Sequence, residues 1–441
     1  MARICATNKT KTMLKKIFGT FGTRLLNAIC GFITLWFGTH YLGDEAWGVG
    51  GVVLLDVSLL LIGVEFLSGS GLIFFTPRKS FRTLFKISYI WATLVVAFYA
   101  LIMYICSLIA PKVLDEFIPE GYHCMVLILV FIYSIHNFNL TTLLGKERVG
   151  TNNILFIIQF MTQMISMLFF IFVMNIRDAH AFVYSLLTGY VVGYICGLTQ
   201  IWQYLKEKGS ESIWQTIKEM LRFGTIIQVS TLVSMLNRRL SYLIIRSFWG
   251  DAHVGVYSAA TQVSESPKLI GLSIAMVQFS KISNLTDNDL AAKITIKLVK
   301  MATLLTALCM LVICIIPTSV YSWLFTSNFA PMRAVMIALA PGIVFMAAHM
   351  VFVHYFSGTN KPQYDLYGAL IGLAVTIPSL YLLIPPFGMV GAGMSVSITY
   401  FSIVLYNWII FRRLSKLSAK ELLVTKDDVK NIITQVKEIF K

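Results

Sequence analysis

Arginines stand inside apolar stretches of this sequence, where a charge needs a partner. Arg24, Arg238 and Arg239 each lie within a run long enough to cross a membrane. A charge at that depth is costly unless it meets an opposite charge, a water-filled cavity or a ligand. The planar guanidinium binds two phosphate or carboxylate oxygens at once. We therefore predict a cationic site for an anion. Consecutive helical residues point about 100° apart, so at most one of Arg238 and Arg239 faces the cavity, and Arg238 is favoured because a glutamate lies at its level.

Two glutamates are placed at the depth of two of these arginines. In a hairpin of antiparallel helices, residues equally distant from the turn share one level, and this holds for Arg238 with Glu265 and for Arg24 with Glu65. Each pair is either an ion pair that holds adjacent helices together or an arginine that alternates between its glutamate and the anion. The outcome depends on helix rotation, which spacing leaves open.

Four groups are candidates for binding a proton or a sodium ion: Asp56, Glu65, Glu265 and His349. Asp56 lies near mid-membrane with no basic residue at its level in its own hairpin, and an apolar medium disfavours a charged carboxylate. It is either a proton site or a neutral acid hydrogen-bonded to a hydroxyl. His349 and the nearby His354 can carry protons or be structural residues.

The segment 265–268 combines two charges with a proline. Pro267 removes a backbone hydrogen bond and can bend its helix, so it is predicted to be a hinge beside Glu265 and Lys268, or else a tolerated kink. Arg246 is expected to reach the membrane surface. Asp365, near the opposite surface, is expected to be solvated.

The composition places these residues in a membrane protein. Of the 441 residues, 57% are hydrophobic and only 13% charged, and the mean hydropathy is +0.75. An excess of 36 Lys and Arg over 21 Asp and Glu does not indicate nucleic-acid binding, because the basic residues fall at the ends of apolar runs. The seven cysteines show no metal-ligand spacing and are expected to be small core residues. No metal or other cofactor is predicted.

A spanning helix needs roughly 20 mostly apolar residues. Twelve segments meet this length, so the expected fold is an all-α integral membrane protein with about 12 transmembrane helices. They are 17–41, 47–75, 85–109, 123–144, 153–174, 181–204, 223–248, 254–280, 298–317, 332–356, 365–384 and 388–411.

Alternate connections differ strongly in basic residues. With both termini on one side, 28 of the 36 Lys and Arg lie on that side, and only Lys112, Arg177 and Arg333 lie on the other. Because cytoplasmic loops carry the basic excess, both termini are predicted to be cytoplasmic. The loops on the opposite side are short and offer no domain for a soluble active site. The chain is therefore predicted not to be an enzyme.

The sequence repeats itself. GDEAWGV at 43–49 matches GDAHVGV at 250–256, and LLGKERVGTNNILF after the fourth helix resembles FSGTNKPQYDLYGA after the tenth, with Gly145 facing Gly358. Six helices per repeat return the chain to its starting side, so the repeats are parallel.

Four regions follow from the repeat. They are an N-terminal six-helix lobe (1–205), a cytoplasmic linker (206–222), a C-terminal six-helix lobe (223–411) and a cytoplasmic tail (412–441). The tail is predicted to contain a short amphipathic helix that lies on anionic headgroups or packs on the inner loops.

The chain resembles the polysaccharide transporter family, which includes bacterial O-antigen and capsule repeat-unit flippases. The likeness rests on the order of several motifs: a basic start, YLGDEAWGVG, then FGTIIQVSTLVSMLNRRLSYLIIRSFWGDAHVGVYSAA, and PPFGMVGAGMSVSITY near the end. The family belongs to a superfamily of multidrug, oligosaccharidyl-lipid and polysaccharide exporters. The resemblance covers essentially the whole chain.

The resemblance implies two lobes in a V around a central cavity that opens alternately to either side. It implies a bacterial inner-membrane flippase that carries undecaprenyl-diphosphate-linked oligosaccharide to the outer leaflet, driven by a proton or sodium gradient. The implied partners are this lipid-linked cargo, membrane lipids and the glycan polymerase or glycosyltransferases of the same pathway. A cation-coupled multidrug exporter of the same superfamily is the alternative, and a membrane glycan polymerase is disfavoured by the short outer loops.

Overall fold

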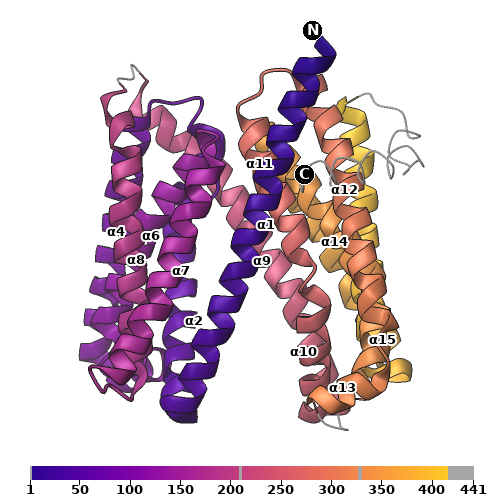
Figure 1. Ribbon diagram of the computed structural model, residues 1–441. Helices are drawn as coiled ribbons and strands as arrows, with labels where there is room; N and C mark the ends of the chain where they lie inside the picture. Colours follow the sequence, from indigo (N-terminus) through magenta and orange to yellow (C-terminus); the bar gives the residue numbers. More distant parts are fainter. Residues whose placement is uncertain (1, 208–210, 326–329, 416–441) are drawn as a thin grey trace. The chain divides into compact units, whose positions relative to one another are not determined.

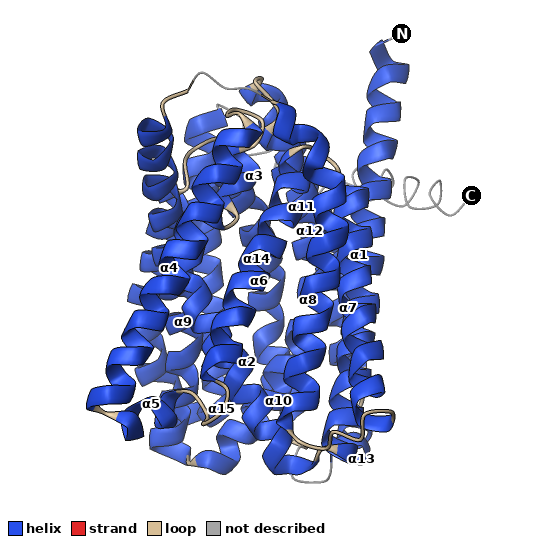
Figure 2. Ribbon diagram, turned by 90° about the vertical axis from the view of Figure 1, so that its left-hand side faces the viewer, coloured by secondary structure: helices blue, strands red, loops and turns tan. Residues whose placement is uncertain are grey.

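The computed structural model describes residues 2–207, 211–325 and 330–415. Within them the chain forms helices joined by short loops, and no strand is present (Figure 2). The predicted all-α class is confirmed. The predicted amphipathic tail helix lies outside the described residues. The chain divides into two compact units, Gly19–Thr225 (the N-terminal unit) and Ile226–Lys441 together with Met1–Phe18 (the C-terminal unit).

The N-terminal unit is a bundle in which α4, α6, α7 and α8 lie side by side (Figure 1). Its elements are the part of α1 (Ala2–Tyr41) that follows Phe18, α2 (Gly43–Ser68), α3 (Gly71–Phe75), α4 (Phe81–Ile109), α5 (Pro111–Phe117), α6 (His123–Gly145), α7 (Val149–Phe172), α8 (Ala179–Ile201) and the 3₁₀-helix η1 (Trp202–Lys206).

The C-terminal unit is built around α14, which contacts α10, α11, α12 and α15. Its elements are α9 (Ile213–Trp249), α10 (Asp251–Glu265), α11 (Lys268–Ser283), α12 (Asn288–Ile315), α13 (Thr318–Phe325), α14 (Met332–Gly358) and α15 (Gln363–Ser415). Helix α9 begins within the N-terminal unit and continues into this one.

The helices account for the twelve predicted spans. Nine helices of the described residues are long and apolar enough to cross a membrane. One of them, α15, has 53 residues, which is about 80 Å of helix and far more than one crossing needs. It is two helices joined at a kink, where Gly388 has φ +55°. Helix α9 and the broken pair α10–α11 supply the other two spans.

The two units repeat one pattern of elements. In each, a long first helix precedes a broken pair (α2–α3, α10–α11), a long helix and a short one (α5, α13). Three more long helices follow, α6, α7 and α8 in one unit and α14 with the two halves of α15 in the other. The repeated sequence motif around Gly145 and Gly358 also has the same backbone conformation in both units. Helix α6 ends at Gly145 and α14 at Gly358, and two residues later Glu147 and Asn360 both have positive φ, +57° and +62°. The internal repeat predicted from sequence is therefore visible in the structure.

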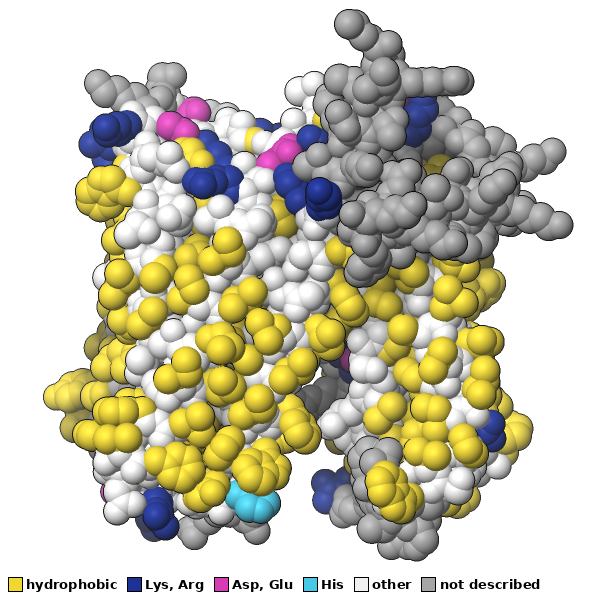
Figure 3. Space-filling model, in the orientation of Figure 1, with side chains coloured by type: hydrophobic (Ala, Val, Ile, Leu, Met, Phe, Trp, Pro, Cys, Tyr) yellow, Lys and Arg dark blue, Asp and Glu magenta, His cyan; other side chains and the backbone are white. Residues whose placement is uncertain are grey.

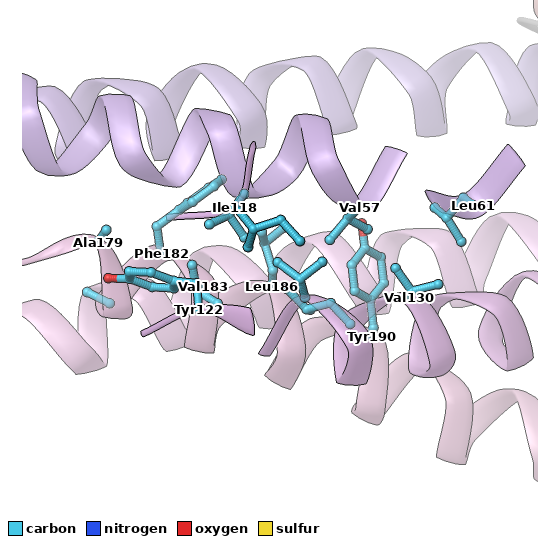
Figure 4. Close-up of a cluster of buried hydrophobic side chains, with 14 of the residues drawn as sticks. Val57, Leu61, Ile118, Tyr122, Val130, Ala179, Phe182, Val183, Leu186 and Tyr190 are labelled. Atoms are coloured by element: carbon cyan, nitrogen blue, oxygen red, sulfur yellow. The ribbon is translucent and has the colours of Figure 1, made fainter. Parts of the chain in front are cut away.

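Each unit has its own apolar core. In the N-terminal unit, side chains of α2 such as Val57 and Leu61 pack on Val130, Leu186 and Tyr190 (Figure 4). The core of the C-terminal unit is centred on α14. Burial of such side chains contributes roughly 25 cal/mol per Å² in water, but in a bilayer close packing matters more.

Apolar side chains also cover the outside of the N-terminal unit. They form a band across its middle, and charged side chains gather at one end (Figure 3). On α4, Ile90, Leu94 and Phe98 are each 59% exposed. A soluble protein rarely exposes so large an apolar surface, whereas a bilayer covers it. The chain is a multi-pass membrane protein.

The described residues of the predicted linker 206–222 contact the N-terminal unit through three glutamates. Glu207 accepts from Lys146 Nζ at 2.8 Å, and Glu219 of α9 forms an ion pair with Lys79 at 2.8 Å. Glu211 lies 3.3 Å from the backbone N–H of Ser80. The start of α9 is therefore part of the N-terminal unit, and the division between units falls inside a continuous helix, at Thr225.

Candidate functional site

A cavity of about 250 Å³, lined by both apolar and polar side chains, lies within the C-terminal unit. Helices α9, α10, α11, α14 and α15 line it, so it is enclosed by elements of one unit. Its charged and imidazole groups are Arg238, Glu265, Lys268, His349, His354 and Asp365. The rest of the wall combines hydroxyl, amide and tyrosine side chains with apolar ones. Polar groups of this density inside an apolar bundle mark a binding site rather than a core.

Arg238 and Glu265 both face this cavity, and both interact with one tyrosine. The exposed Arg238 side chain and the Glu265 carboxylate both lie in electrostatic range of the Tyr400 hydroxyl. The ion-pair partner of Glu265 is Lys268, whose Nζ lies 3.4 Å from Oε2. The two members of the predicted Arg238–Glu265 pair thus share the cavity, but a different cation neutralises the glutamate.

The break at Pro267 positions that ion pair. Helix α10 ends at Glu265 and α11 begins at Lys268, with the buried Pro267 between them. Proline cannot donate the backbone hydrogen bond that would continue α10. The break therefore places an acid at one helix end and a base at the next helix start, both toward the cavity.

Asp365 is a cavity residue that the sequence did not indicate. It was expected to be solvated, but its side chain is only 16% exposed and accepts a 2.6 Å hydrogen bond from Ser230 of α9. Its Oδ1 lies 4.0 Å from Nε2 of His349, whose Nδ1 is 2.9 Å from the Asn407 amide nitrogen. Three helices thus meet in one polar cluster. The signal available in the sequence was its position seven residues after Gly358 in the repeated motif.

The other predicted ion-binding groups lie in the N-terminal unit. Asp56 of α2 is 7% exposed within the apolar core, and its Oδ2 has no hydrogen-bond partner among the described residues. Glu65, half-buried on the same helix, lies in electrostatic range of Tyr133. The predicted hydrogen bond of Asp56 to a hydroxyl is therefore not seen for this oxygen.

The predicted cationic residues are divided between the units. Arg24 is half-buried on α1, with its guanidinium carbon 5.5 Å from the centre of the Phe156 ring, a cation–π contact. Arg238 lines the cavity of the C-terminal unit. Arg239 follows it in α9, and its side chain lies outside what the structure describes.

Residues 42–334 match a protein family described as "Polysaccharide biosynthesis protein". Among curated proteins, the chain is similar to the probable low-salt glycan biosynthesis flippase Agl15 of Haloferax volcanii. The two are 24% identical over 234 residues, which are 52% of this chain and 49% of the relative. The similarity therefore spans about half the length of that relative.

Solved structures share the fold over nearly the whole chain. A mutant form of the MATE transporter VcmN of Vibrio cholerae has a TM-score of 0.76 at 15% identity, covering 94% of this chain and all of that one. A MOP superfamily transporter from Pyrococcus furiosus has a TM-score of 0.74 at 15% identity, covering 93% and 96%. Because the family match covers more than half of the sequence and the fold agrees with it, the chain belongs to the polysaccharide transporter family of the MOP superfamily.

Proposed function

We propose that this protein is a flippase for undecaprenyl-diphosphate-linked oligosaccharide. It carries the repeat unit from the cytoplasmic to the outer leaflet by alternating access. Support comes from the family match and from the relative named as a glycan biosynthesis flippase. The proposal includes no bond-making step, so the protein acts as a transporter.

The observation that carries this proposal is that two cationic side chains and several hydroxyl and amide groups line the same cavity. Arg238 and Lys268 both line this cavity. A guanidinium and an ammonium suit the two phosphates of a diphosphate. Hydroxyl and amide groups, such as those of Ser234, Asn237 and Thr261, suit the sugar that follows. The lipid tail remains in the bilayer and needs no pocket.

Ion coupling is assigned to the N-terminal unit in this proposal. Asp56 is a buried carboxyl whose Oδ2 lacks a hydrogen-bond partner among the described residues. A carboxyl in that setting is favoured in its neutral form and releases a proton when water reaches it. Exchange of protons against cargo at Asp56 drives export, and sodium in place of the proton is the alternative.

The setting is the bacterial inner membrane, with both termini in the cytoplasm. The uneven distribution of Lys and Arg supports this orientation. The glycosyltransferases that build the cargo on the inner face and the polymerase that uses it on the outer face are the expected functional partners.

The test is transport in proteoliposomes. The purified protein is reconstituted with a short-chain prenyl-diphosphate oligosaccharide carrying a fluorophore, and movement between leaflets is followed by quenching from outside. Arg238→Ala should lower initial transport by roughly ten- to a hundredfold, the value of a charge-assisted contact of about 1.5–3 kcal/mol.

Arg246→Ala is the matched control, because Arg246 lies on the same helix but does not line the cavity. It should transport at the wild-type rate. Equal rates for Arg238→Ala and Arg246→Ala would remove Arg238 from the binding site. Wild-type protein that moves cationic drugs but no lipid-linked sugar would replace the proposed function with multidrug export.

A further inference from the structure

The internal repeat places two buried histidines at equivalent positions. His136 lies nine residues before Gly145 at the end of α6, and His349 lies nine residues before Gly358 at the end of α14. The same register aligns Asn152 of α7 with Asp365 of α15, since each lies seven residues after its glycine. The surroundings of His136 can therefore be compared directly with those of His349.

The N-terminal copy is neutral. His136 is 1% exposed, and its Nε2 lies 3.1 Å from the Gln159 side-chain oxygen. Asn152 donates to the backbone carbonyl of Leu140 at 2.9 Å. The hydrogen-bond partners described for this histidine include no carboxylate. A polar pair of this kind holds helices together.

The C-terminal copy differs in charge and in access. An aspartate stands where the N-terminal copy has an asparagine, and His349 and Asp365 are 15% and 16% exposed beside the cavity. Nδ1 of His349 accepts from the Asn407 amide, which leaves the imidazole hydrogen on Nε2, the atom 4.0 Å from Asp365. That gap is too long for a hydrogen bond and short enough for an ion pair once the ring is charged.

Asn407 is able to serve both states of the ring. Its amide oxygen is buried and has no hydrogen-bond partner among the described residues. If the amide turns over, this oxygen accepts from Nδ1–H of a doubly protonated His349. The imidazolium then has one acceptor on each nitrogen, Asn407 on Nδ1 and Asp365 on Nε2.

We propose that His349 and Asp365 together bind one proton, and that this proton strengthens the binding of an anionic group in the same cavity. The first part stands on the geometry alone, and the second rests on the proposed function. The cargo chemistry concerned is a phosphate or diphosphate ester.

The charges that face the pair explain why an added proton strengthens the binding of an anion. From α9 the cavity receives Arg238, from α10 Glu265 and from α11 Lys268, while α12 contributes no residue to it. The remaining titratable groups are His354 of α14 and three tyrosines: Tyr242, Tyr257 and Tyr400. With Asp365 ionised and His349 neutral, two cations balance two anions. One added proton makes the cavity net positive.

In this linkage the proton and the anion favour each other's binding, whereas in proton-for-cargo exchange the proton displaces the cargo. A bound proton here holds the anion and does not expel it. The pair therefore controls retention of the head group, and exchange is left to the separate carboxyl of Asp56. Two charges about 8 Å apart, the width of such a cavity, change affinity by roughly two- to thirtyfold.

The proton site is tested without any cargo. Full-length protein with ¹⁵N-labelled histidine is titrated from about pH 8 to about pH 5, the range in which imidazole changes charge. The His349 signal, identified by its loss in His349→Gln, should report proton uptake, and the His136 signal should not. Asp365→Asn should shift the His349 titration to more acid pH. A His349 signal that is constant over this range, or unaffected by Asp365→Asn, would overturn the proton site.

The linkage is tested with a sugar diphosphate diester, whose two phosphate charges are constant over this pH range. Wild-type protein and His136→Gln should bind it more tightly at about pH 5.5 than at about pH 8 by the factor given above. His349→Gln should bind it equally at both. A pH effect that survives in His349→Gln overturns the linkage. Absence of binding at every pH counts against the proposed cargo and leaves the histidine titration to decide the proton site.

Discussion

Lys268 and Glu265 face each other across the break between α10 and α11, with Nζ and Oε2 3.4 Å apart. Both side chains are about 30% exposed to the cavity, at 31% and 29%. The pair is an i,i+3 contact within ion-pair distance, and ion pairs that solvent can reach are weak. Either partner is therefore available to a ligand.

Glu265→Gln should strengthen binding of a sugar diphosphate diester. Removing one negative charge about 8 Å from an anion is worth roughly two- to thirtyfold in affinity. The measurement is equilibrium binding to the purified protein. Glu120→Gln, a change at an exposed residue outside the cavity, is the control and should leave affinity unchanged. Weaker binding to Glu265→Gln would show that the carboxylate contacts the ligand directly, for example through sugar hydroxyls.

Pro267→Ala should slow transport without lowering thermal stability. Alanine allows α10 and α11 to join into one helix, because the missing backbone hydrogen bond is restored. That change removes the predicted hinge and moves Glu265 relative to Lys268. The comparison is Pro341→Ala, since Pro341 lies inside α14 and has an exposed side chain. Equal transport rates in the two variants would make Pro267 a tolerated kink.

Asp56→Asn should preserve the fold and abolish the response of transport to a pH gradient. The amide has nearly the shape of the carboxylic acid but cannot release a proton. The measurement is the transport rate with and without an imposed gradient. Glu120→Gln, which changes an exposed acid outside the cavity, is the control and should keep its response to the gradient. A gradient response retained in Asp56→Asn would exclude this aspartate from coupling.

Gly224→Ala should destabilise the protein by about 1–3 kcal/mol, the usual cost of overpacking. Helix α9 passes so close to α2 that a Cβ at Gly224 would overlap the Phe66 carbonyl oxygen. Gly22→Ala in α1 is the matched control, because no atom lies within 4 Å of its Cβ position. That variant should be neutral or more stable by up to about 1 kcal/mol. Thermal unfolding in detergent measures both changes, and equal midpoints would refute the close contact.

The sequence alone determined the fold class, the number of spans and the repeat, and it predicted the depth of the charged residues. Each of these depends on local composition or on distance along the chain. Helix length follows from apolar runs, and the depth of Arg238 and Glu265 follows from a constant rise per residue.

Only the tertiary structure decided which of these residues meet. Membrane helices are apolar on most sides, so the sequence pattern does not specify their rotation. For this reason Lys268, and not Arg238, proved to be the ion-pair partner of Glu265. Asp365 lies in the cavity because α15 packs along α14 and because Ser230 of α9 donates a hydrogen bond to it. Ser230 and Asp365 are 135 positions apart in the sequence. Packing set the rotations, and the rotations placed these side chains around one cavity.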